Sequence, residues 1–286
     1  MQHLANDYIR SNVITGHSPQ TSTIPQQVFS TLDIAAIKTE LEKDCTSYLY
    51  SAVISFIDAL NGLTRGFYSW PTVKLYYSVF YALRAYMGLK DICIFYVGKK
   101  VFSIDLNSAI NAHKEGGTTH KVVLDVFKRS FPHNVLLSQD IDQKHPFDWL
   151  TDLREHTNYK NPKFCEPSTP THFSKIENLC IATALQAYNE DEDYLYTFDD
   201  DHACVAYPLK IIRLALSEFD DKGLTFDNLD LEHISTALAQ IDGATECFSE
   251  FFYEEEEFDE EEFDGNESDG NDPAEPQDVL ANQTED

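Results

Sequence analysis

Residues 70–89 read WPTVKLYYSVFYALRAYMGL, and this stretch decides the fold class. It is rich in tyrosine and phenylalanine at helical spacing, and Pro71 stands where the first turn of a helix tolerates it. Ser69 is placed to cap the helix that begins here. Aromatic side chains at this spacing bury large areas, so we expect Trp70 to Leu89 to form a core helix rather than a base-stacking surface.

A longer amphipathic helix is predicted upstream, from about Asp33 to Leu63, with Gly62 as its terminator. Its apolar side chains follow steps of three and four residues throughout, which defines one buried stripe. The stripe consists of Ile34, Ile37, Leu41, Cys45, Tyr48, Ala52, Phe56, Ala59 and Leu63. Residues 1–32 are rich in Ser, Thr, Gln and Pro, and we expect a loosely ordered polar arm there.

Downstream of the aromatic helix, two β-rich runs, Ile92–Val97 and Val101–Ile104, surround a turn at Gly98 and predict a β-hairpin. Helical patterns return over 118–131, 146–159, 171–189, 203–219 and 228–252. The predicted fold is therefore mostly α. We expect a helical bundle with one small inserted hairpin, and additional C-terminal helices over 191–249.

The charge of the chain is strongly acidic and unevenly placed. Its 286 residues carry 49 Asp and Glu against 21 Lys and Arg, a formal net charge of −28. Residues 250–286 hold 17 acidic residues and no Lys or Arg, which predicts a disordered acidic tail. Residues 90–163 instead carry 11 basic against 9 acidic side chains, so any contact with a polyanion is expected in this segment.

Composition also excludes several classes of protein. At 42% hydrophobic residues the chain can bury a core, and without a run of 18 apolar residues it has no predicted membrane span. The polar N-terminus lacks the apolar core of a secretory signal, which favours a cytoplasmic protein. Six cysteines lack the paired spacing of zinc or redox motifs, so we expect reduced, packed thiols. They are Cys45, Cys93, Cys165, Cys180, Cys204 and Cys247.

Familiar catalytic motifs are absent, including the phosphate-binding glycine loop, the nucleophile elbow and the HExxH metal motif. The run Asp199-Asp200-Asp201-His202 offers oxygen and imidazole ligands for a divalent ion. Adjacent residues on a loop rarely converge on one ion, so we interpret this run as solvated charge. No metal or other cofactor is predicted.

Three further segments occur in an informative order. They are Lys74–Met87 within the aromatic helix, THKVVLDVFKR over 119–129, and LREHTNY over 153–159. This series resembles the HEPN superfamily of small α-helical domains, in the branch with a YYxxFYAxRA helix, a later HxxV…F helix and a final LRExxxY helix. The resemblance covers about residues 33–190 and implies a four- or five-helix bundle that dimerises.

Active HEPN members are metal-independent RNA endonucleases of toxin–antitoxin and anti-phage systems, with a signature of Arg, four to six residues, and His. In this chemistry a 2′-hydroxyl attacks the adjacent phosphate, His moves the proton, and Arg stabilises the developing charge. The resemblance gives the Arg role to Arg154, but Tyr159 stands at the place of the His, and His156 is only two residues away. The candidate catalytic residues are therefore Arg154, Tyr159 and His156. The candidate RNA-binding residues are Lys99, Lys100, Lys121, Lys128, Arg129 and Lys160.

Three functions stay open on these grounds. The first is an RNA-directed component of a prokaryotic defence or toxin–antitoxin system that acts as a homodimer. The second is a non-enzymatic interaction module, in which Arg154 and Tyr159 pack at a dimer interface and the acidic tail binds a basic protein partner. The third is a nucleic-acid mimic, which fits less well because most of the excess acid lies in the tail.

Overall fold

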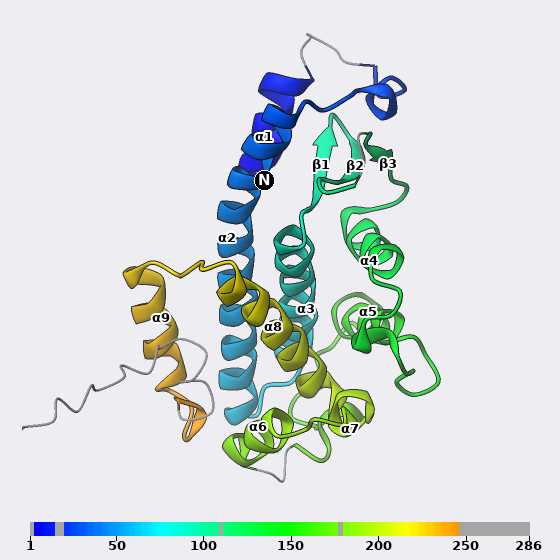
Figure 1. Ribbon diagram of the computed structural model, residues 1–286. Helices are drawn as coiled ribbons and strands as arrows, with labels where there is room; N and C mark the ends of the chain where they lie inside the picture. Colours follow the sequence, from blue (N-terminus) through cyan, green and yellow to red (C-terminus); the bar gives the residue numbers. More distant parts are fainter. Residues whose placement is uncertain (1–2, 15–19, 109–110, 177–179, 246–286) are drawn as a thin grey trace, which may run out of the picture. The chain divides into compact units, whose positions relative to one another are not determined.

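The computed structural model of the protein describes residues 3–14, 20–108, 111–176 and 180–245. Within these residues the chain folds into nine α-helices and a three-stranded antiparallel sheet (Figure 1). The predicted fold class, mostly α with a small inserted hairpin, is confirmed. The acidic segment 250–286 and its predicted disorder lie outside the described residues.

The elements follow one another in the chain order shown in Figure 1. The helices are α1 (Leu4–Tyr8), α2 (Thr31–Thr64), α3 (Ser69–Leu89), α4 (Thr119–Ser130), α5 (Pro146–Glu155), α6 (Ile181–Asn189), α7 (Leu195–Phe198), α8 (Ala203–Asp221) and α9 (Asn228–Leu238). The strands are β1 (Ile92–Val97), β2 (Lys100–Asp105) and β3 (His113–Lys114), which pair in that order. Short π-helices follow α1 and α5, over Ile9–Val13 and His156–Lys160.

Two long helices, α2 and α3, pack against each other and form the centre of the fold. α2 begins with a capping box, in which the Ser30 and Asp33 side chains each accept a hydrogen bond from the other's backbone N–H. The predicted stripe of α2 is buried from Ile37 to Ala59. α3 is buried along most of its length because α2, α4, α5, α8 and β1 all pack against it.

α2 and α3 pack closely together at Gly88. A Cβ atom built on this glycine would collide with Cys45 Sγ, and it would lie 3.3 Å from Leu41 Cδ1. Gly88 therefore lets the backbone of α3 lie directly on side chains of α2, which no larger residue could do without displacing them.

The structure differs from the sequence-based expectation near the N-terminus, because residues 3–14 are helical and packed. Ala5 and Ile9 are buried in the core. The carboxylate of Asp44 on α2 accepts hydrogen bonds from the backbone N–H groups of Leu4 and Ala5, at 2.9 and 3.0 Å. These are the N–H groups that the start of a helix leaves unpaired, so Asp44 holds α1 in place.

Two of the predicted helices are shorter than expected. Residues 171–189 form a 3-10 turn at Thr171–Phe173 and the separate helix α6, rather than one helix. The predicted helix over 228–252 ends at Leu238, and Gly243 then adopts a φ of 75°. That left-handed conformation cannot continue an α-helix, and residues from 246 onward lie outside the described part of the chain.

The hairpin prediction is confirmed, with β1 and β2 joined through a turn at Gly98. Five of the cysteines are free thiols, as expected, and Cys247 lies outside the described residues. Within the described residues, none of the helices is both long and apolar enough to cross a bilayer.

The N-terminus of α3 is capped by Glu166 rather than by Ser69. Glu166 Oε1 accepts hydrogen bonds from the backbone N–H groups of Tyr68 and Ser69, each at 2.7 Å, and Oε2 accepts one from the Ser69 hydroxyl at 2.7 Å. Ser69 is therefore the first residue of the helix, and its N–H and hydroxyl donate hydrogen bonds to the capping carboxylate of Glu166. Although partial burial raises the pKa of Glu166, these hydrogen bonds from Ser69 and Tyr68 lower it to about 2.

We expect Glu166→Gln to lower the free energy of unfolding by about 1 kcal/mol at neutral pH, because an amide cannot accept as many of these hydrogen bonds. The pKa of Glu166 is depressed in the folded state from 4.5 to about 2, so the carboxylate stabilises the fold above pH 4.5 and loses this effect as the pH falls toward 2. Urea unfolding at neutral pH and near pH 3 should therefore give a smaller difference at the lower pH.

Glu232→Gln, on the exposed surface of α9, is the matched control and should change stability at neither pH. An equal loss of stability by Glu166→Gln at both pH values would contradict the capping role of the carboxylate.

Candidate functional site

The candidate residue Arg154 lies at the end of α5, against the aromatic face of α3. Its Cζ atom is 4.8 Å from the centre of the Tyr76 ring and 5.6 Å from that of the Tyr159 ring. The side chain is only 13% exposed, and Nε is buried without a hydrogen-bond partner in the described part of the chain. A guanidinium over tyrosine rings gains cation–π energy, so the two tyrosines hold Arg154 in a defined place.

The other two candidate catalytic residues lie differently. Tyr159, on the π-helix after α5, is 68% exposed and stands beside Arg154. His156 is exposed and lines a separate surface cavity with Thr72 and His172. The structure therefore brings Arg154 and Tyr159 together, but His156 does not join them on the Tyr76 ring.

The six candidate RNA-binding residues do not form one patch. Lys99 and Lys100 lie at the hairpin turn, while Lys121 is exposed on α4. Three others are engaged within the chain: Lys128 with Asp148 at 4.0 Å, Arg129 with Glu115 at 2.6 Å, and Lys160 with Glu155 at 3.5 Å. Because Arg129 pairs with a buried glutamate, its first role is to hold α4 to the sheet.

The structure adds His120, the second residue of α4, to the Arg154 site. The centre of its ring lies 5.7 Å from that of Tyr76 and 4.4 Å from that of Phe80. Arg154 and His120 thus contact the same Tyr76 ring. Sequence reasoning missed His120 because it searched for a histidine on the helix of the arginine, although His120 stands in the second segment of the HEPN-like series.

The surroundings of His120 keep its imidazole neutral. Burial lowers the pKa of His120 below its ordinary 6.5, and the positive charges of Arg154 and Arg84 lower it further. At neutral pH the ring therefore has a free lone pair, which is the state that a general base requires.

One nitrogen of His120 is hydrogen-bonded to Tyr76, because Nδ1 lies 3.2 Å from the Tyr76 hydroxyl. In the tautomer in which Nδ1 donates to the Tyr76 oxygen, Nε2 is the unprotonated nitrogen that can take up a proton.

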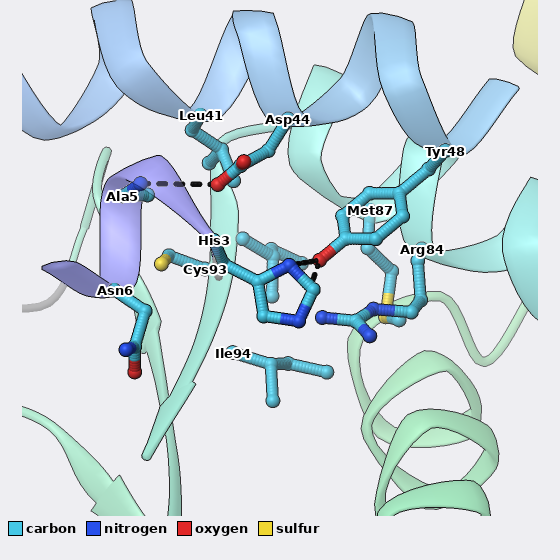
Figure 2. A pocket seen from close by; sticks show the side chains of 11 residues that line it. His3, Ala5, Asn6, Leu41, Asp44, Tyr48, Arg84, Met87, Cys93 and Ile94 are labelled. Atoms are coloured by element: carbon cyan, nitrogen blue, oxygen red, sulfur yellow. Dashed lines mark hydrogen bonds between the residues drawn. The ribbon is translucent and has the colours of Figure 1, made fainter. Parts of the chain in front are cut away.

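Arg84 is the second cation near His120, and it is almost fully buried. Its Cζ lies 4.2 Å from the centre of the Tyr48 ring and 5.8 Å from that of Phe80. Arg84 also lines a small cavity with His3, Asp44 and Tyr48, where the Tyr48 hydroxyl is hydrogen-bonded to the His3 ring (Figure 2). Burial, with a further contribution from Arg84, lowers the pKa of His3 to about 4, so this cluster joins α1, α2 and α3 without a second positive charge.

Comparisons with protein-family models, with curated proteins and with solved structures find no match to this chain. What this site can do is therefore inferred from its residues and their geometry.

The acidic run before α8 remains a cluster of surface carboxylates. Asp199, Asp200 and Asp201 have carboxylate oxygens within 4.8 Å of one another. His202 does not join them, because its Nδ1 is hydrogen-bonded to the Tyr188 hydroxyl at 2.9 Å. The carboxylates of Asp199 and Asp200 are exposed, as expected for solvated charge.

We expect Arg154→Gln to raise the pKa of His120 toward 6.5, because the substitution removes one of the two positive charges that lower it. NMR titration of the histidine ring carbons measures this shift directly. His145 is an internal control, since burial and Lys128 lower its pKa and Arg154 does not contribute. A His120 pKa that stays unchanged in this variant would contradict the proximity of the two side chains.

Proposed function

We propose that this chain is an RNA-directed protein that cleaves single-stranded RNA without a metal ion, as a HEPN-like component of a prokaryotic defence or toxin–antitoxin system. One observation carries the proposal: a neutral His120 and a largely buried Arg154 contact the same Tyr76 ring. Together they supply the base and the cation that HEPN-type cleavage needs, although they come from different helices. The order of the three HEPN-like segments supports the same conclusion.

The proposed reaction begins at the ribose. His120 Nε2 accepts the proton of a 2′-hydroxyl, and the 2′-oxygen attacks the adjacent phosphorus. Arg154 donates hydrogen bonds to the non-bridging oxygens, where negative charge accumulates. The bond from phosphorus to the 5′-oxygen then breaks, and this oxygen leaves with a proton from the Tyr159 hydroxyl. Solvent returns the proton from His120 to Tyr159. The products are a 2′,3′-cyclic phosphate and a 5′-hydroxyl.

Lys121 extends this site toward the RNA backbone. It follows His120 on α4, is exposed, and forms no ion pair with another described residue. A lysine without an ion-pair partner, next to the general base His120, can attract the phosphate that follows the scissile one. In the proposed function the protein acts as a homodimer, as its superfamily resemblance implies, and sedimentation of the full chain checks this point.

The experiment incubates the full chain with single-stranded RNA in EDTA and maps the ends of the products. We expect 2′,3′-cyclic phosphate and 5′-hydroxyl ends, and no cleavage of single-stranded DNA of the same sequence, which lacks the attacking 2′-hydroxyl. Cleavage that needs an added divalent metal, or that leaves 5′-phosphates, would overturn the proposal. RNA left intact while a basic protein partner is bound would favour the non-enzymatic interaction module.

A further inference from the structure

A cavity lies next to the Arg154 site, and the proposed reaction does not use it. Its volume is about 290 Å³, and its polar lining residues include Thr72, His156, Thr157, Asn161, Lys163 and His172. Thr72 precedes Tyr76 by one turn of α3, and His156 follows Arg154 by two residues. At a rise of about 1.5 Å per residue, Thr72 and Tyr76 are separated by about 6 Å along the helix axis. The cavity therefore lies one turn of α3 away from the proposed cleavage site.

The charge of this cavity is unusual for so acidic a chain. Lys163 lines it, and no carboxylate is found among its described lining residues, although the Glu166 carboxylate accepts a hydrogen bond from the lining residue Ser69. Because the chain as a whole has a net charge of −28, a lining with a lysine attracts phosphate more than the chain on average does. The cavity is thus one of the places where an RNA strand can approach closely.

Hydrogen bonding makes His172 an acceptor within this cavity. The Thr72 hydroxyl donates to the Tyr68 carbonyl oxygen at 2.9 Å, so it accepts in its 3.1 Å hydrogen bond with His172 Nε2. Nε2 therefore carries the hydrogen, and Nδ1 has the lone pair. Burial lowers the pKa of His172 to about 4, which keeps this arrangement at neutral pH. With the Asn161 amide, the cavity offers both donors and acceptors for the edge of a nucleobase.

Exposed aromatic rings flank the same cavity. Trp70 and Phe164 are 51% and 49% exposed, and their ring centres lie 5.9 Å apart. Each follows a lining residue in the sequence, Trp70 after Ser69 and Phe164 after Lys163. Exposed aromatic side chains beside a basic residue are the features on which the bases of single-stranded nucleic acids stack.

We propose that this cavity is a nucleobase subsite of the cleavage site. It holds the base next to the scissile phosphate, Trp70 stacks on the following base with Phe164 packed edge-on against the indole, and Lys163 contacts the phosphate between the two bases. The subsite rests on the proposed RNA-directed function and specifies its substrate as single-stranded RNA, because a base within a duplex cannot enter the cavity.

The test measures binding separately from cleavage. The probe is a fluorescein-labelled single-stranded RNA of mixed sequence with 2′-O-methyl sugars, which has no 2′-hydroxyl proton to lose and stays intact. Anisotropy titrations compare the wild-type chain with Asn161→Ala, Lys163→Gln and the double variant Trp70→Ala/Phe164→Ala. The controls are Lys43→Gln on the exposed face of α2 and Phe67→Ala, an exposed aromatic residue that does not line the cavity.

We expect the double aromatic variant to bind about tenfold more weakly, because the stacking of the following base is lost with the aromatic pair. Asn161→Ala should also weaken binding, because it removes a partner for the base edge. Lys163→Gln should reduce the slope of log affinity against log salt by about 0.7, the effect of one phosphate contact on a single strand. Both controls should match the wild type.

The outcomes separate the subsite from the function on which it rests. Unchanged binding by all cavity variants, with binding or cleavage lost in Arg154→Ala, would overturn the subsite and leave the proposed function in place. A wild-type chain that binds no RNA would overturn both. If the double aromatic variant changes the oligomeric state in light scattering but not the RNA affinity, those rings belong to a protein interface and the subsite is wrong.

Discussion

His120→Gln is expected to slow RNA cleavage by a factor of about 10² to 10⁴, which is the contribution of a well-placed general base. Gln keeps a hydrogen-bonding group at this position but cannot take up the 2′-hydroxyl proton. Initial rates on a labelled single-stranded RNA in EDTA measure the effect, and a circular dichroism melt shows whether the fold is intact. His133→Gln, an exposed histidine after α4, is the matched control and should retain full activity.

The pH profile distinguishes a proton-transfer role from a structural one. Because the pKa of His120 lies below 6.5, the wild-type rate should be constant above neutral pH and fall as the pH drops through that pKa. This decline should disappear from the residual rate of His120→Gln. A folded His120→Gln protein with wild-type activity would remove His120 from the mechanism.

Gly88→Ala is expected to lower the free energy of unfolding by about 1–3 kcal/mol, the usual cost of overpacking a core. Helix propensity alone would predict the opposite change in stability, because it favours Ala over Gly by about 0.5–1 kcal/mol within a helix. The new methyl group would collide with Cys45 Sγ at the contact between α2 and α3. Urea unfolding of the two proteins measures the difference.

A double-mutant cycle tests the cause. Cys45→Ala removes the sulfur, so Gly88→Ala should be less destabilising in that background by more than about 0.5 kcal/mol. Gly116→Ala is the matched control, since a Cβ atom there meets nothing within 4 Å. A Gly88→Ala protein as stable as the wild type, or a cycle without coupling, would contradict the close packing of the two helices.

Much of the fold follows from local patterns in the sequence. The apolar stripe from Ile37 to Ala59 was predictable because its spacing is that of a helix, and the hairpin was predictable because two β-rich runs surround the turn at Gly98. The third strand was not, because His113 and Lys114 form a two-residue polar strand without an apolar alternation. The Glu166 cap was not predictable either, since it joins residues 97 positions apart in the chain.

In the candidate site too, residues close in sequence could be predicted, and a residue brought in by packing could not. Arg154 and Tyr159 were found because they are close in sequence and belong to one motif. His120 comes from another helix, and only the packing of α4 and α5 against α3 places it beside Tyr76. No spacing rule within one helix could have found this partner. His120 lies in the second of the three segments quoted from the sequence and Arg154 in the third, and both contact the ring of Tyr76 in the first.

The covered position of α3 has a consequence for how the molecule moves. Its backbone is covered by α2, α4, α5, α8 and β1 over most of its length, so we expect its central amide hydrogens to exchange slowly with solvent. Arg154 and Tyr159 instead lie at the end of a ten-residue helix and on the short π-helix after it, where local opening is easier. The site thus combines Tyr76 on a covered helix with Arg154 and Tyr159 on short elements, and we expect the amide hydrogens of residues 154–160 to exchange faster than those around Tyr76.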